Sequence, residues 1–180
     1  PDMFQQADLF APYEAASTLG SLPDLIERIS QVSKRPRYAF MVLNLIYKAV
    51  GQGDSVGPYV RYGGALLPVR DWLCEALIPL AQRDGRRRTL IEAVRADLVA
   101  KGQLPEDPAA AEILLAEEVK ARILRSGRTS ISRAASDLVR AGLLRRHYKG
   151  YRIDHANRGA QREAVYTITP EARRALGRVH

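Results

Sequence analysis

Hydrophobic and polar positions follow their most regular pattern in the last third of the chain. From 129 to 140, apolar residues fall three and four apart, which predicts an amphipathic helix. We expect this helix to begin after Gly127, where Thr129 or Ser130 can cap its first turn, and to end at Gly142. The residues of its expected buried face are Ile131, Ala134, Ala135, Leu138 and Val139.

Two strands and another helix are predicted after this helix. Residues 143–153 form a plausible strand, and residues 163–169 alternate cleanly between two faces. The segment between them is rich in turn formers and basic residues, which predicts a long hairpin over 147–162. Thr169, followed by Pro170 and Glu171, is typical of a helix start. Helix, strand, basic hairpin, strand and helix is the order of a winged helix.

The rest of the chain is predicted to be helical. The expected helices cover residues 21–33, 38–50, 68–83, 90–101 and 107–125. The helix over 38–50 is apolar almost all round, so it is either the central helix of the domain or a dimer seam. Residues 1–20 are interpreted as an arm, and residues 51–64 as a glycine-rich loop without the spacing of a nucleotide-binding loop.

Three basic or glycine-containing stretches are interpreted from their local composition. Residues 34–37 form a small basic cluster around a proline, of the kind that usually serves as a solvated linker. Residues 86–88 predict a triple-arginine turn ahead of a helix capped by Thr89. Gly127 is expected to break the chain between 107–125 and 129–140, which would make these two helices a helix-turn-helix.

These elements predict a mainly α fold with a small two-stranded antiparallel β wing. The fold class is a winged helix-turn-helix with an N-terminal helical extension. We divide the chain into an N-terminal arm and short helix (1–37), a helical region for the core or for dimerisation (38–106), and the predicted winged helix-turn-helix region (107–180).

The distribution of charge separates the two parts of the chain. The formal net charge is +8. Residues 120–180 hold 15 Lys and Arg against 4 Asp and Glu, whereas the remainder holds 13 against 16. The excess positive charge therefore lies where the winged helix is predicted, which favours a nucleic-acid partner over a merely solvated face. A membrane partner would require bulky apolar anchors on an amphipathic helix, and the basic segment offers a hairpin instead.

The polar side of the 129–140 helix has the side chains of a major-groove reader. An α-helix fits that groove, and an arginine can donate two parallel hydrogen bonds to guanine. Asp137 is interpreted as a surface acid that pairs with Arg133 or Arg140. On the helix, the candidate DNA-binding residues are Arg128, Thr129, Ser130, Ser132, Arg133, Ser136 and Arg140. On the wing they are Lys149, Arg152, Asn157, Arg158, Gln161 and Arg162.

Two segments of this region resemble a known family. The first segment, RTSISRAASDLVRAGLLRR, is similar to the recognition helix and first wing strand of winged-helix regulators of the multiple-antibiotic-resistance-repressor (MarR) type. The second segment, YTITPEARRAL, is similar to the strand and helix that close the wing in the same family. The resemblance implies that Ser130, Ser132 and Arg133 make base and phosphate contacts. It also implies that Arg158 and Arg162 lie on the wing.

No catalytic set emerges from the pattern. His147, His155 and His180 lack the spacing of metal ligands, and the acids of the basic half are too dispersed for a magnesium site. Cys74, the only cysteine, is expected to be a buried, inert thiol in a reducing compartment. We therefore expect no enzyme activity, no metal and no cofactor. The chain also has no long apolar run or leader pattern, so the predicted location is the cytoplasm.

The leading hypothesis is a homodimeric, bacterial-type transcriptional regulator that binds double-stranded DNA in a sequence-specific manner. The alternatives are a plasmid or phage replication or partition protein, and a winged helix used as a protein-interaction module. The pattern identifies neither the DNA sequence, nor the sign of regulation, nor the dimer interface. A small-molecule effector has no support, because core packing explains the aromatic residues equally well.

Overall fold

The structure is a computed structural model that describes residues 20–81, 86–149 and 163–177. It is mainly helical with small antiparallel sheets, as predicted. The helices are α1 (Leu22–Val32), α2 (Pro36–Val50), α3 (Val69–Ala81), α4 (Arg86–Ala100), α5 (Pro108–Arg140) and α6 (Pro170–Gly177). The strands are β1 (Ser55–Val56), β2 (Tyr59–Tyr62), β3 (Ala65–Pro68), β4 (Leu144–Lys149) and β5 (Glu163–Ile168).

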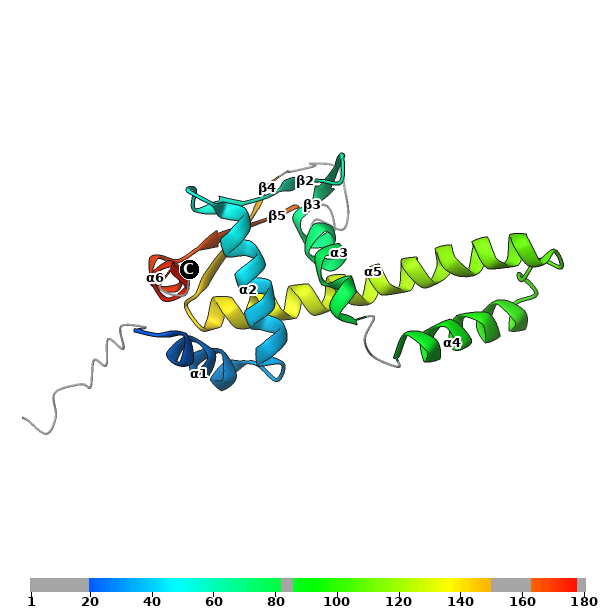
Figure 1. Cartoon of the computed structure of the whole chain (residues 1–180), viewed down its shortest axis with the longest axis horizontal. Coiled ribbons are helices and arrows are strands. Elements are labelled where there is room, and N and C mark those ends of the chain that lie inside the picture. Colours follow the sequence, from blue (N-terminus) through cyan, green and yellow to red (C-terminus); the bar gives the residue numbers. More distant parts are fainter. Residues whose placement is uncertain (1–19, 82–85, 150–162, 178–180) are drawn as a thin grey trace, which may run out of the picture.

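The long helix α5 joins two parts of the molecule (Figure 1). Its C-terminal part crosses a body that contains α1, α2, α3, α6 and the strands. Its N-terminal part extends away from this body with α4 beside it. We call α4 together with residues 108–125 of α5 the arm.

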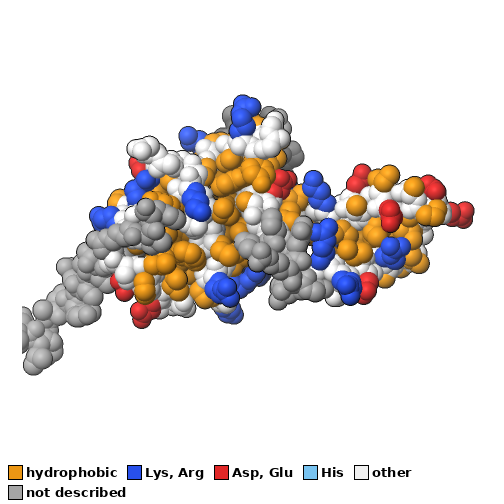
Figure 2. All heavy atoms as spheres, in the orientation of Figure 1, with side chains coloured by type: hydrophobic (Ala, Val, Ile, Leu, Met, Phe, Trp, Pro, Cys, Tyr) orange, Lys and Arg blue, Asp and Glu red, His pale blue; other side chains and the backbone are white. Residues whose placement is uncertain are grey.

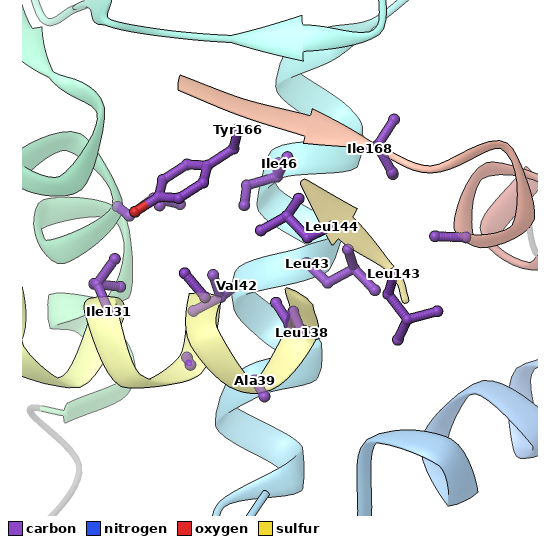
Figure 3. Close-up of a cluster of buried hydrophobic side chains, with 14 of the residues drawn as sticks. Ala39, Val42, Leu43, Ile46, Ile131, Leu138, Leu143, Leu144, Tyr166 and Ile168 are labelled. Atoms are coloured by element: carbon purple, nitrogen blue, oxygen red, sulfur yellow. The ribbon is translucent and has the colours of Figure 1, made fainter. Parts of the chain in front are cut away.

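The hydrophobic core of the body lies around α2. Ala39, Val42, Leu43 and Ile46 are all fully buried. Figure 3 shows these side chains facing residues of α5, β4 and β5. The prediction of a helix over 38–50 is confirmed, and of its two interpretations the structure supports the central helix of the domain.

The sheet that contains the predicted wing strands β4 and β5 has three strands rather than the predicted two. The strand order is β1-β5-β4, and both pairs are antiparallel. β1 pairs Val56 with Tyr166, more than 100 residues away in sequence. A strand of two residues has no periodicity to read, so the sequence pattern missed it.

The glycine-rich segment 51–64 is not a loop throughout, which corrects a second prediction. β2 and β3 form an antiparallel hairpin whose turn is Gly63-Gly64. Both glycines have positive φ, 56° and 78°, as the two-residue turn of a right-twisted hairpin requires.

The predicted break at Gly127 is also wrong. α5 runs through it for 33 residues, so residues 107–125 and 129–140 do not form a helix-turn-helix. Thr129 does not cap a helix, because its hydroxyl donates to the carbonyl of Arg125 one turn earlier (3.4 Å). A Cβ at position 127 would lie 2.8 Å from Sγ of Cys74, so the glycine allows α3 to pack closely on α5.

Several predicted helix ends are confirmed. The side chains of Ser21, Asp107 and Thr169 accept hydrogen bonds from backbone N–H groups in the first turns of α1, α5 and α6. Gly142, with φ 71°, follows the end of α5, and the next N–H donates to the carbonyl of Leu138 (3.0 Å). Arg86–Arg88, in contrast, form the first turn of α4 rather than a turn ahead of it.

Two predicted features lie outside the described residues. The first is the N-terminal segment 1–20, which is not the arm defined above and of which only residue 20 is described. The second is the wing tip over 150–162. Within the described part of the chain, no helix combines the length and apolar character needed to cross a membrane.

Candidate nucleic-acid interface

An open groove of about 790 Å³ lies between the last part of α5 and the turn that joins α1 to α2. From α5 it is lined by Thr129, Ser130, Ser132, Arg133, Ala134, Ser136, Asp137 and Arg140. From the other side it is lined by Val32, Ser33, Lys34, Arg35 and Tyr38. We call it the α5 groove.

The amphipathic pattern of 129–140 places these side chains in the groove. Ile131, Ala135 and Leu138 are fully buried against the body, so the polar residues between them face outward. Val139 departs from the prediction, because it lies at the edge of the buried face and is 38% exposed.

The turn between α1 and α2 brings two further cations to the groove. The guanidinium of Arg35 stacks on the ring of Tyr38, 4.3 Å from its centroid, while the Lys34 side chain is exposed. Burial raises the pKa of Tyr38 to about 12, so its hydroxyl adds no negative charge at neutral pH. The basic cluster at 34–37, interpreted from the sequence as a linker, therefore contributes to the candidate site. This role becomes visible only in the fold, which places the cluster beside α5. The sequence alone does not show that the two segments are neighbours.

Arg140 links the two sides of the groove. Its guanidinium forms an ion pair with Asp137 and donates to the backbone carbonyl of Val32 (3.3 Å). Asp137 is the only acidic residue among those that line the groove, so the pair with Arg140 neutralises its charge. The expected pairing of Asp137 is thereby confirmed with Arg140.

Arg146 of β4 supports the exposed face of α5 from the sheet side. Its Nη2 donates to Oγ of Ser136 (3.2 Å) and its Nη1 to the carbonyl of Ser132 (3.5 Å). Ser136 in turn donates to that same carbonyl (2.9 Å). Arg146 is not among the residues predicted from the sequence, although its position two residues after the buried Leu144 puts it on the helix-facing side of the strand.

Arg128 lies on a different side of α5 from the groove. Its Nε and Nη2 donate to the two carboxylate oxygens of Asp71 on α3, at 2.6 and 2.8 Å. This bidentate pair competes with any contact of Arg128 to an external anion. Arg128 is therefore the one predicted DNA-binding residue of the helix that does not line the α5 groove.

Arg133 is the candidate that is most available to a ligand. Its side chain is exposed and makes no hydrogen bond or ion pair with any residue that the structure describes. Thr129 and Ser130 lie beside it in the groove. Lys149 is exposed at the end of β4. The remaining predicted wing residues, Arg152, Asn157, Arg158, Gln161 and Arg162, lie outside the described residues.

The chemistry of the groove suits a polyanion. Lys34, Arg35, Arg133 and Arg140 surround a face that carries four hydroxyl groups. Lys and Arg side chains also gather at the lower edge of the body in Figure 2, where α1 meets α2. Across the described segments, no group of three or more His, Cys, Asp or Glu side chains is arranged to hold a metal ion.

No family model, no curated protein and no solved structure matches this chain.

Proposed function

We propose that the chain binds double-stranded DNA in a sequence-specific manner through the α5 groove. The last part of α5, residues 129–140, enters the major groove. The observation that carries the proposal is the concentration of four cations around one exposed helix face whose only acid is already paired. A duplex presents closely spaced phosphates, which complement the charge of the α5 groove, and its major groove admits one helix.

The topology of the body supports a winged-helix interpretation. In a winged helix, a first strand pairs with the second wing strand, and two helices lie between the first strand and the wing. Here β1 pairs with β5, β5 pairs with β4, and α3 and the last part of α5 lie between β1 and β4. In this interpretation α3, rather than residues 107–125, is the helix that precedes the recognition helix. The β2–β3 hairpin and the arm are additions to it.

The contacts within the groove assign different roles to its residues. Arg133 has no competing partner among the described residues, so it reads a base edge, with a loss of about 1–3 kcal/mol in discrimination when it is removed. Arg35 is held by its stack on Tyr38 and contacts phosphate, together with Lys34. Arg146 orients the helix rather than contacting DNA, because its guanidinium is bonded to α5.

Selection from a random duplex pool tests the proposal. The wild-type chain is compared with Arg133→Ala and Arg35→Ala, with Arg61→Ala as a control of equal charge change on the distant β2–β3 hairpin. Each protein is tested at about 50 and 200 mM salt, between which six neutralised phosphates predict about a thousandfold loss of affinity.

We expect an enriched motif that Arg133→Ala relaxes at one position. Arg35→Ala should weaken binding to all sequences alike and reduce the salt slope by about one. Retention of DNA with no motif would contradict sequence-specific binding. No retention at low salt would contradict DNA binding itself and would favour a protein-interaction module.

A regulatory role is the further part of the proposal, and it follows from the resemblance of the two C-terminal segments to MarR-type regulators. The position of the selected motif in the genome tests it. Promoter sites are expected for a regulator, whereas sites confined to replication origins or partition loci would assign the chain to replication or partition.

A further inference from the structure

The arm has a hydrophobic cluster of its own. Val94 and Leu98 of α4 pack on Leu115 and Val119 of α5, and this cluster is separate from the main core. Asp97 and Arg122 add an ion pair between the two helices. Two helices with one narrow seam leave most of their circumference exposed, and short helices depend on packing for their stability. The arm therefore has exposed helix faces on which another protein surface can pack.

Large apolar side chains remain exposed on the arm outside this seam. Val99 of α4 is 58% exposed and Ile113 of α5 is 63% exposed. Their neighbours Ala96, Ala109 and Ala116 are also exposed, so another helix could approach both positions closely. Figure 2 shows apolar side chains along the face of the arm that is in view.

Charge on the arm changes sign between its two ends. Residues 102–119 toward the free end contain five acids, Glu106, Asp107, Glu112, Glu117 and Glu118, and no Lys or Arg, while the adjacent Lys101 is paired with Asp97. The end next to the body carries Arg87 and Arg88 on α4 and Arg125 on α5, all of which are exposed. Figure 2 shows the same gradient, with acidic side chains toward the free end and basic ones toward the body.

We propose that the occupant of this surface is the arm of a second copy of the chain, packed antiparallel to the first. An antiparallel pair brings the acidic end of each arm to the basic end of its partner, twice, as a two-fold dimer requires. A parallel pair would oppose like charges at both ends. Val99 and Ile113 lie toward the free end of each arm, so in this pair they would pack against the body-side part of the partner arm, in a four-helix arrangement.

The oligomeric state of the full chain tests this proposal without DNA. Sedimentation equilibrium is compared for the wild type, Ile113→Glu, and Leu66→Glu. Leu66 is a matched control, since it is 61% exposed on β3 and lies outside the arm. We expect a wild-type dimer, a dissociation constant raised on the order of tenfold or more by Ile113→Glu, and no change with Leu66→Glu. Equal far-UV circular dichroism of all three excludes loss of helix as the cause.

Charge reversal distinguishes the antiparallel pair from other associations. One variant reverses the acidic end (Glu112→Lys with Glu117→Lys), and the other reverses the basic end (Arg87→Glu with Arg88→Glu). Each alone should be monomeric, because its two ends then carry the same sign. An equimolar mixture of the two should form a heterodimer, since every contact again pairs opposite charges.

A monomeric wild type at tens of micromolar, or a mixture that stays monomeric, would overturn the proposal. An Ile113→Glu variant that dimerises as well as the wild type would also overturn it. The result is independent of the proposed DNA binding, because no residue changed here lines the α5 groove.

Discussion

Tyr166 combines complete burial with a hydroxyl group that finds no hydrogen-bond partner among the described residues. Its ring extends from β5 across the core toward α3 (Figure 3). An unsatisfied buried polar group costs about 1–3 kcal/mol. We therefore expect Tyr166→Phe to raise the free energy of unfolding by about 1 kcal/mol in urea denaturation.

Tyr148→Phe is the control for this measurement. Tyr148 lies on the adjacent strand and is 46% exposed, so loss of its hydroxyl should leave the free energy of unfolding unchanged. A destabilised Tyr166→Phe would show that the hydroxyl has a stabilising partner and would refute this explanation.

At the scale of single residues, the sequence predicted which side chains of the candidate site face outward and the local pair of Asp137 with Arg140, but not the contacts with residues distant in sequence. The 3.6-residue period correctly separated Ser132 and Arg133 from Leu138. It could not separate Arg128 from Arg133, because the partner of Arg128 is Asp71, which lies 57 residues earlier in the chain. Such pairings depend on how α3 crosses α5, and no local pattern contains that information.

The passage of α5 through Gly127 leads to a prediction at the scale of the element. In a helix, Gly→Ala usually stabilises by about 1 kcal/mol. Here the new Cβ would lie 2.8 Å from Sγ of the buried Cys74, so overpacking of about 1–3 kcal/mol opposes that gain. We expect Gly127→Ala to be neutral to destabilising in the wild type, and stabilising by up to about 1 kcal/mol when Cys74→Ala is also present.

Urea denaturation of the two single variants and the double variant measures this change of sign. A Gly127→Ala variant that is equally stabilised in both backgrounds would show that α3 does not press on α5 at this position. A variant that destabilises both backgrounds would show that the helix is interrupted there, as the sequence pattern alone suggested.

The helices that the sequence predicted correctly are those with a long apolar segment or with a capping residue at one end. α2 has the first, and α1 and α6 have capping residues at their starts. Gly127 was misinterpreted because a glycine within a helix and a glycine that ends one look alike in sequence. What differs is the presence of Cys74 on the opposite helix.

Across the whole molecule, α5 connects the two surfaces for which we propose partners. One helix of 33 residues, about 50 Å long at 1.5 Å per residue, carries the acidic end of the arm at one terminus and the α5 groove near the other. Pairing of two arms would thus fix the separation of two recognition surfaces through a single rigid element. Of the two interpretations of the 38–50 helix, central helix or dimer seam, its burial in the core of the body supports the first.

The stability of the whole fold should fall at alkaline pH. Burial raises the pKa of Cys74 to about 11 and those of Tyr38 and Tyr166 to about 12, from ordinary values of 9.0 and 10.0. The unfolded chain therefore releases these protons first. Stabilisation is complete below about pH 9 and is lost as the pH rises to about 12, by up to about 1.4 kcal/mol per pH unit for each group.

Urea unfolding at intervals between about pH 8 and 11.5 measures this loss, with Tyr166→Phe removing one of the three groups. Because phenylalanine has no proton to release, the variant should lose stability less steeply than the wild type above about pH 10. Tyr62→Phe, which changes a tyrosine that is 45% exposed, should keep the wild-type slope. Equal slopes for all three proteins would mean that Tyr166 releases its proton as readily in the folded chain as in the unfolded one. The core around β5 would then be open to water, contrary to the packing between α2, α3 and α5.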